Sequence, residues 1–322
     1  MSPRSTKSAG SGVVVGALVA FLAGCSFGLG GAVSQIVGSH GFSIMQVCFA
    51  QYTCAAILLG LLVLVRFRPT MTRKEMLQMV FLGAISSISS FTYYQAITLI
   101  GVSAAVAIQF QYVWMVVVIQ ALAERKVPGR WTAISSILIV VGTFFGSGMA
   151  DEVMSGGLTM EPLGLVYAII CALFYAIFIY FSGRVAPNAE PVSKTFFGVL
   201  GGFILIACLT PSNGGFGFDV AALAPWGLIM GVIMSIVPVL FIVVASSLIS
   251  GSLVAVLTSS ELPMAVFAGF LLLHEEVTPL IVFGVVVILG AICLAQLDNK
   301  GNKPVGKLQM RPEETDGSNG RV

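Results

Sequence analysis

The stretch LVAVLTSSELPMAVFAGF, Leu253–Phe270, contains one carboxylic acid, Glu261, among residues that are otherwise apolar or small. If Ser252–Leu273 forms a membrane helix of about 33 Å, Glu261 lies close to the bilayer midplane. An ionised side chain costs at least about 2.5–3.5 kcal/mol there. Pro263 removes a backbone donor two residues later and frees the carbonyl of Ser259. Because lipid does not tolerate freed backbone groups, the stretch predicts a polar cavity at mid-depth that the other helices enclose.

The composition is that of a membrane protein. Of the 322 residues, 57% are hydrophobic and 9% are charged, and the mean hydropathy is +1.00. Soluble domains carry roughly 25% charged residues, so this chain cannot cover a surface that faces water. The six cysteines all fall within apolar runs, where they favour helix packing over disulfides.

Several function classes lack their motifs in this sequence. It has no zinc-ligand spacing, no glycine-rich nucleotide loop and no nucleophile elbow, so we expect no cofactor, no metal and no ATP-driven transport on this chain. Its helices carry too few basic residues to bind nucleic acid. An intramembrane enzyme would need two catalytic groups at one depth, and only Glu261 qualifies. A receptor or assembly protein would add a folded soluble domain.

Apolar runs of spanning length predict an all-α polytopic protein with ten transmembrane helices. The expected ranges are Val13–Val37, Ser43–Val65, Glu75–Leu99, Ser103–Ala123, Trp131–Gly148, Pro162–Ser182, Lys194–Leu209, Ala222–Ser246, Ser252–Leu273 and Pro279–Leu297.

The basic residues indicate the orientation of these helices. All 16 Lys and Arg residues fall before the first helix or after every second one, on a single side. The connections on the other side contain no Lys or Arg; their acidic residues and histidines are His40, Asp151, Glu152, Glu161, Asp219, His274, Glu275 and Glu276. Since basic loops stay in the cytoplasm, we predict a multi-pass protein of a bacterial-type plasma (inner) membrane with both termini cytoplasmic.

The chain repeats itself loosely at an offset of 148–151 residues. Gly101 pairs with Gly251, Glu124 with Glu275, Pro128 with Pro279, and Gly142 with Gly290. A unit of five helices crosses the membrane an odd number of times, so its second copy is inverted, as in transporters that alternate between two faces. We therefore predict a cytoplasmic tail (1–12), a first five-helix repeat (13–148), an external linker (149–161), a second repeat (162–297) and a disordered cytoplasmic tail (298–322).

Three stretches resemble the drug/metabolite transporter superfamily, in particular its EamA-like branch: AGCSFGLGGAVSQ, YAIICALFYAIFIYFSGR and SSELPMAVFAGFLLLHEEVTPLIVFGVVVILG. The resemblance spans residues 13–297. It implies a secondary transporter that moves a small organic metabolite, often outward. The chain departs from the family at Phe27, where a tryptophan is frequent. It also departs at Val113-Trp114, where no proline matches Pro263, so the sequence leaves open whether both halves kink alike.

Glu261 is the principal candidate for the transport site. It could titrate as a proton carrier, or remain charged and bind a cationic amine. The alternative is a structural acid that forms hydrogen bonds with Ser259 or Ser260. The neighbouring His274-Glu275-Glu276 cluster, at a helix end, is interpreted as a cap or a solvated turn.

Amides and aromatic rings supply further candidates for solute binding, namely Gln109, Gln111, Tyr112, Trp114, Tyr94 and Tyr175. Gln109 and Tyr112 share one helix face, and Gln111 shares another with Trp114. Interhelical hydrogen bonding is the alternative role for these groups. Pro263 and Pro238 are the predicted helix breaks.

These features predict a secondary transporter, and an exporter by the resemblance, that works by alternating access around a central cavity. The expected solute is an amino acid or a similar amphipathic molecule, uncharged or zwitterionic, because only one ionisable side chain lies at mid-depth. A multidrug or amine transporter coupled to protons through Glu261 is the alternative. The expected partners are the small-molecule solute, protons and the lipid bilayer, in a monomer or a homodimer.

Overall fold

The computed structural model describes residues 4–66, 71–157, 161–212 and 219–299, and all regular structure in these ranges is helical. The predicted tail beyond residue 299 lies outside the described residues. In chain order the helices are α1 (Arg4–Ser39), α2 (Ile44–Val65), α3 (Arg73–Ile100), α4 (Val102–Gln109), α5 (Tyr112–Glu124), α6 (Arg130–Gly146), α7 (Met149–Ser155), α8 (Pro162–Ser182), α9 (Pro191–Leu209), α10 (Val220–Met230), α11 (Val237–Leu248), α12 (Gly251–Thr258), α13 (Glu261–Ala268) and α14 (Pro279–Asn299).

The predicted set of membrane helices is confirmed, with one qualification. Within the described ranges, nine segments are long and apolar enough to cross a membrane. The tenth is α6, which has 17 residues and reaches spanning length only together with α7, from which it is bent by 51°. The segment predicted as a linker therefore starts with a short helix. At the other end of the first repeat, α1 starts at Arg4 rather than at Val13.

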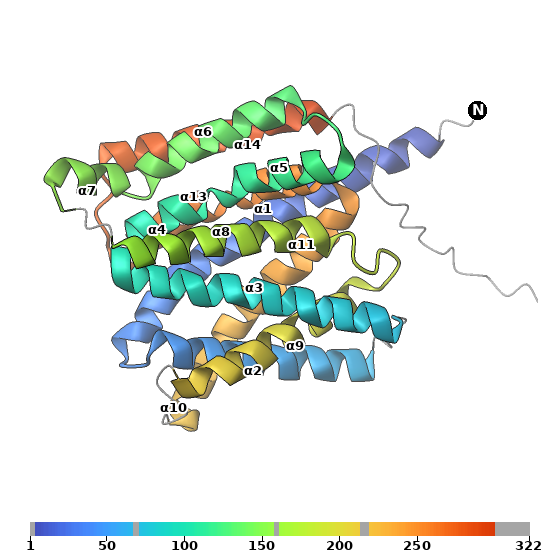
Figure 1. Cartoon of the computed structure of the whole chain (residues 1–322), viewed down its shortest axis with the longest axis horizontal. Coiled ribbons are helices and arrows are strands. Elements are labelled where there is room, and N and C mark those ends of the chain that lie inside the picture. The colour runs from blue at the N-terminus through green and yellow to red at the C-terminus, as the bar shows by residue number, and fades with distance from the viewer. Residues whose placement is uncertain (1–3, 67–70, 158–160, 213–218, 300–322) are drawn as a thin grey trace, which may run out of the picture.

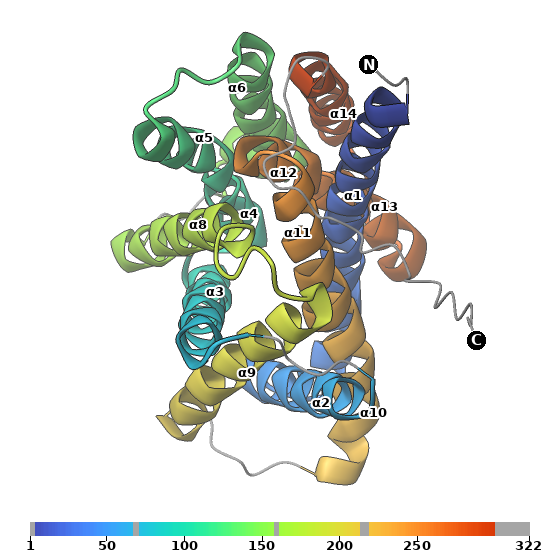
Figure 2. The same cartoon turned by 90° about the vertical axis from the view of Figure 1, so that its right-hand side faces the viewer.

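The two repeats interlock instead of forming separate lobes. Helix α1 of the first repeat packs against α11, α12 and α13 of the second, and α3 packs against α8 and α9 (Figures 1 and 2). Helix α6 lies along α14, where Gly142 and Gly146 face Gly284 so closely that a Cβ on Gly284 would meet backbone atoms of both. Small residues thus permit the close approach of helices on which packing in lipid depends.

Both repeats contain the same broken helix. Helix α4 ends and α5 begins around Phe110-Gln111, and α12 ends and α13 begins around Ser259-Ser260, which is 149 residues later. The backbone angles of the paired residues agree within a few degrees, with φ −64° and ψ −6° at Phe110 and φ −64° and ψ −7° at Ser259. The two halves therefore break alike, although the first has no proline.

Pro263 and Pro238 therefore do not by themselves break the helices that contain them. Pro263 is the third residue of α13, after the break, in the first helical turn where a missing N–H is tolerated. Pro238 is the second residue of α11 and follows a π-helical turn, Gly231–Ile236, yet Val220–Leu248 continues as one span of 29 residues. The wider turn accommodates the missing donor without interrupting the helix.

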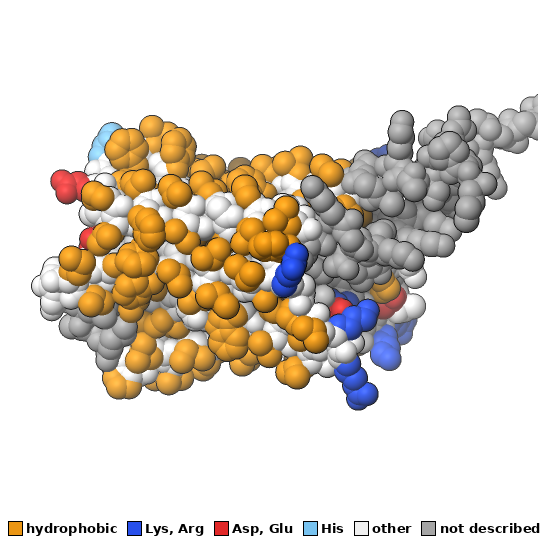
Figure 3. All heavy atoms as spheres, turned by 90° about the horizontal axis from the view of Figure 1, so that it is seen from above, with side chains coloured by type: hydrophobic (Ala, Val, Ile, Leu, Met, Phe, Trp, Pro, Cys, Tyr) orange, Lys and Arg blue, Asp and Glu red, His pale blue; other side chains and the backbone are white. Residues whose placement is uncertain are grey.

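Charges lie at the two ends of the bundle, and apolar side chains cover the surface between them. Figure 3 shows hydrophobic side chains over the middle of one face, Lys and Arg at one end, and acidic side chains with a histidine at the other. We call these the basic end and the acidic end. Helix α1 starts and α14 ends at the basic end (Figure 1).

Candidate functional site

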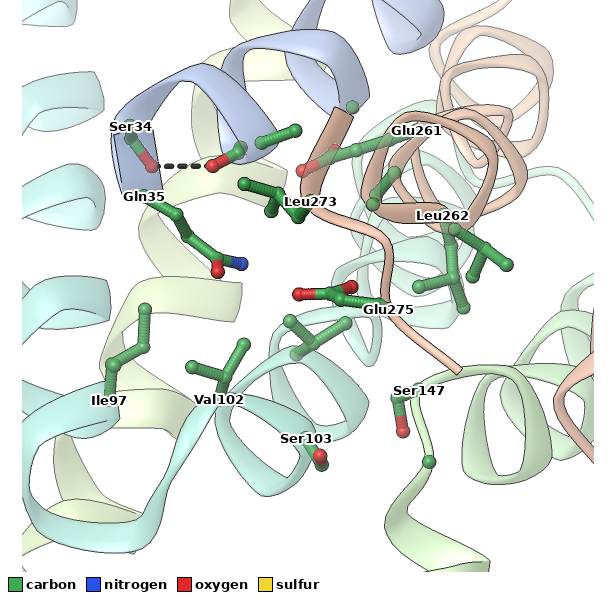
Figure 4. A pocket seen from close by; sticks show the side chains of 18 of the residues that line it. Ser34, Gln35, Ile97, Val102, Ser103, Ser147, Glu261, Leu262, Leu273 and Glu275 are labelled. Carbon is green, nitrogen blue, oxygen red and sulfur yellow. Dashed lines mark hydrogen bonds between the residues drawn. The ribbon is translucent and has the colours of Figure 1, made fainter. Parts of the chain in front are cut away.

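A cavity of about 660 Å³ lies between the two repeats. Its walls come from α1, α3, α4, α13 and the segment before α14, and it extends from Glu261 to the chain segments of the acidic end, which include Gly148 and Glu276 (Figure 4). Ligand pockets in proteins typically measure about 300–1,000 Å³, so this volume suits a small organic molecule.

Glu261 lies at the deep end of the cavity, as the first residue of α13. The break that precedes it is held against α1, because Ser260 Oγ donates to the carbonyl oxygen of Phe21 at 2.7 Å. Ser259 Oγ donates to the carbonyl of Ala255 at 3.1 Å. Both hydroxyl protons are therefore engaged elsewhere, and within the described residues the Glu261 carboxylate has no hydrogen-bond partner.

The cavity floor is formed where the two broken helices meet. Tyr112, the first residue of α5, is completely buried, and its hydroxyl lies 3.1 Å from Thr258 Oγ1 at the end of α12. The Tyr175 ring of α8 stands edge-on to Tyr112, with 4.7 Å between ring centroids, and edge-on to Phe27 of the cavity wall, with 6.2 Å. Tyr93, Tyr112 and Tyr175 are close enough to Glu261 to interact with it electrostatically.

At its mouth the cavity carries polar groups that the sequence analysis did not single out for binding. Gln35 of α1 and Glu275 point into the same space as Glu261 (Figure 4), and Glu276, Ser103 and Ser147 also line the cavity. The interpretation of Glu275 as only a cap or a solvated turn is therefore incomplete. The loose pairing of Glu275 with Glu124 was the one sequence signal that set it apart.

The predicted site residues divide into three groups. Glu261 and Tyr94 line the cavity, whereas Tyr112 and Tyr175 lie beneath its floor. Gln109 is outside it, and its buried side-chain oxygen has no hydrogen-bond partner in the described part of the chain. Gln111 and Trp114 share a face as expected, since Trp114 Nε1 donates to Gln111 Oε1 at 2.9 Å, but that face is partly exposed and lies away from the cavity.

Towards the basic end, side-chain contacts join the two repeats. Gln120 Oε1 of α5 accepts hydrogen bonds from the backbone N–H of Ser252 at 2.9 Å and from its hydroxyl at 2.8 Å. Glu124 forms a salt bridge with Arg184, whose guanidinium lies 3.7 Å from the centroid of the Tyr180 ring. We call these contacts the basic-end closure. They join α5 to α12 and α8, so they connect the two repeats.

An interlocked helical bundle with matched broken helices and a cavity at their meeting point defines a multi-pass membrane protein with an internal duplication. The model of the EamA-like transporter family matches residues 14–147 and again residues 162–297, and the chain belongs to this family. The two matches correspond to the two repeats.

The comparison with solved structures extends only to the fold. One solved crystal structure is similar over 90% of this chain and 98% of its own, with a TM-score of 0.72 and 14% sequence identity, which shows a common fold alone. No curated protein matches the chain. Among the described residues no group of three or more His, Cys, Asp and Glu side chains could hold a metal ion.

Proposed function

We propose that the protein is a secondary transporter that exports a small amphipathic organic solute, of about amino-acid size, through the cavity between its repeats. The observation that carries the proposal is the position of Glu261, a carboxylic acid at the deep end of a 660 Å³ cavity, directly after a helix break that both repeats share. Broken helices at mid-depth are a common way to build transport sites from repeats. A single carboxylate at that depth argues against an enzymatic role.

Alternating access is supported by the asymmetry of the two ends. The cavity extends to the acidic end, while towards the other side the basic-end closure joins the two repeats. Because the repeats are related by the same break, the reverse arrangement requires only that the contacts at the two ends exchange. The acidic end corresponds to the outside if the basic residues remain in the cytoplasm, in a bacterial-type inner membrane.

Counterflow in proteoliposomes tests the proposal directly. Liposomes loaded with unlabelled solute should accumulate the labelled form of an amino acid or an amine of similar size, and should not accumulate sugar phosphates, because no basic side chain lines the cavity in the described residues. Preferential exchange of sugar phosphates would contradict the proposal. Exchange that is equal in protein-free liposomes would do the same.

Glu261 has a second candidate role as a proton carrier, which its position in the cavity and its lack of a hydrogen-bond partner favour. The variant Glu261→Gln separates proton transfer from direct contact with the solute, because glutamine keeps the size of the side chain but does not titrate. Loss of the response to a pH gradient, with exchange at equal pH retained, would support proton coupling. Loss of solute binding at every pH would support direct contact with the solute.

A further inference from the structure

The charges of the cavity have one sign. Three carboxylates line it, Glu261 at the deep end and Glu275 and Glu276 at the mouth, and no Lys, Arg or His is among the described lining residues. A low-dielectric cleft lined by one sign of charge concentrates ions of the opposite sign. Ionised carboxylates at the mouth and at the deep end would therefore attract cations and repel anions.

The backbone directs Glu275 into this space. The end of α13 widens into a π-helical turn, Gly269–Leu273, and His274 adopts a left-handed conformation with φ 55°. The chain then folds back, so that the Glu275 N–H donates to the carbonyl of Gly269 at 3.2 Å. The Glu275 carboxylate occupies the place that a Cβ on Gly269 would take, so any residue other than glycine would displace it. In Figure 4 this carboxylate points toward Gln35.

Aromatic rings line the same cavity as the deep carboxylate. They belong to Phe27, Tyr93, Tyr94 and Phe110. Tyr175 lies just behind Phe27, is 6% exposed, and has a hydroxyl with no hydrogen-bond partner in the described structure. A carboxylate among aromatic faces is the arrangement that binds organic ammonium ions, because the rings attract a cation electrostatically and cover its apolar part.

A carboxylate on the solute would find no counter-charge in the same place. The helix N-terminus at the deep end, that of α13, already carries Glu261 in its first turn, which complements the helix dipole. The N-terminus of α5 begins at Tyr112, which is completely buried and does not line the cavity. An added carboxylate would therefore be desolvated beside Glu261 without a counter-charge.

We propose that the cavity takes a small organic ammonium cation that lacks a carboxylate, with Glu275 and Glu261 as its counter-charges at the mouth and at the deep end. This inference rests on the proposed transport function and narrows its solute. An amine enters by exchanging water for the Glu275 carboxylate and then binds between Glu261 and the aromatic rings.

Three compounds with one aromatic body and different charges test the inference. The full chain in detergent is titrated calorimetrically with 2-phenylethylamine, phenylalanine and 3-phenylpropionate. We expect the amine to bind at least about tenfold more tightly than the zwitterion. The ammonium group of each contacts a cavity carboxylate, but only the zwitterion carries a carboxylate that the cavity repels. The anion should bind most weakly.

Matched variants test the two carboxylates. Glu261→Gln should weaken amine binding by at least about tenfold. Glu275→Gln should weaken it by up to about fivefold, because Glu275 is more exposed to water. The control is Glu161→Gln, an exposed acid before α8 at the same end but outside the cavity, and it should change nothing. Glu261→Asp keeps the charge and should bind the amine more tightly than Glu261→Gln does. If Glu261→Gln does not fold, amine binding by Glu261→Asp tests whether the negative charge is needed.

Two kinds of result would overturn the inference. Phenylalanine binding as tightly as the amine, or no amine binding at all, contradicts a site for ammonium ions without a carboxylate. Counterflow of phenylalanine but not of the amine would reject the inference and leave the transporter proposal standing. Tight amine binding that requires Glu261, without counterflow of any of the three compounds, would reject transport and leave the ammonium site.

Discussion

Tyr112 occupies in the first repeat the position that Glu261 occupies in the second, since each is the first residue after the shared break. Its hydroxyl links the two broken helices through Thr258. We expect Tyr112→Phe to lower the free energy of unfolding by about 0.5–1.5 kcal/mol, because one buried hydrogen bond is lost while the ring still packs. Thermal unfolding of the purified protein in detergent measures this. Tyr167→Phe, in α8 at a half-buried position, is the control, and an equal loss there would contradict the assignment.

At the scale of the elements, α1 packs on the broken helix through glycines, and Gly28 is the one that faces α13. A Cβ on Gly28 would collide with the carbonyl oxygen of Glu261 and lie 2.8 Å from the backbone nitrogen of Ala265, whereas a Cβ on Gly31 would meet nothing within 4 Å. Gly28→Ala should therefore destabilise the protein by about 1–3 kcal/mol through overpacking. Gly31→Ala should be neutral or slightly stabilising, because alanine favours the helix. Similar melting temperatures for the two variants would show that α1 is not in close contact with the break.

The break itself belongs to the same scale, and its cause is tested by removing the proline. Pro263→Ala should leave the break and the transport rate unchanged within about twofold, because α4 and α5 break identically without a proline. Ala265→Pro is the contrasting variant. It places proline in the interior of α13, where the cost is about 3 kcal/mol or more, and it should abolish transport. If Pro263→Ala alone abolished transport in a folded protein, the proline would be the essential element.

At the scale of the whole molecule, the proposed alternating access predicts that the basic-end closure stabilises the form that is open at the acidic end. Glu124 and Arg184 are partly exposed, so their salt bridge contributes modestly, about 0.2–1 kcal/mol. We expect Glu124→Gln to shift the population toward the form open at the basic end by up to about fivefold. In a background without the native cysteines, a cysteine placed at Gln35 reports on access to the acidic end. Glu124→Gln should lower its rate of thiol labelling by the same factor, because the acidic end is then open less often. The charge swap of Glu124→Arg with Arg184→Glu should restore labelling, and its failure to do so would argue against a closure by this pair.

Orientation is also a property of the whole molecule, and two exposed loop positions test it. Val127 is 94% exposed between α5 and α6, and Ser39 is exposed at the end of α1. In the same cysteine-free background, Ser39→Cys should react with a membrane-impermeant thiol reagent in intact cells. Val127→Cys should react only after permeabilisation, because basic loops stay in the cytoplasm. The reverse pattern would invert the proposed topology.

Much of this protein was predictable from local properties of the sequence. Apolar run length predicts where helices cross a membrane, and the sorting of Lys and Arg predicts which ends lie together. Glu261 was identifiable because an acid within an apolar run is costly, wherever its neighbours lie. The two repeats were visible as a loose internal resemblance, and the family match at residues 14–147 and 162–297 agrees with them.

Only the tertiary structure decided which polar groups meet. Gln111 and Trp114 look as suitable for binding as Tyr94, but Tyr94 lines the cavity whereas Gln111 and Trp114 pair with each other outside it. The first repeat breaks at Phe110-Gln111 without a proline, and Tyr112, directly after the break, contacts Thr258 of the second repeat. Glu275 reaches the cavity through a π-helical turn and the left-handed His274, which no apolar pattern encodes. The positions of the helices follow from local patterns in the sequence, whereas a cavity depends on contacts between residues that are far apart in the chain.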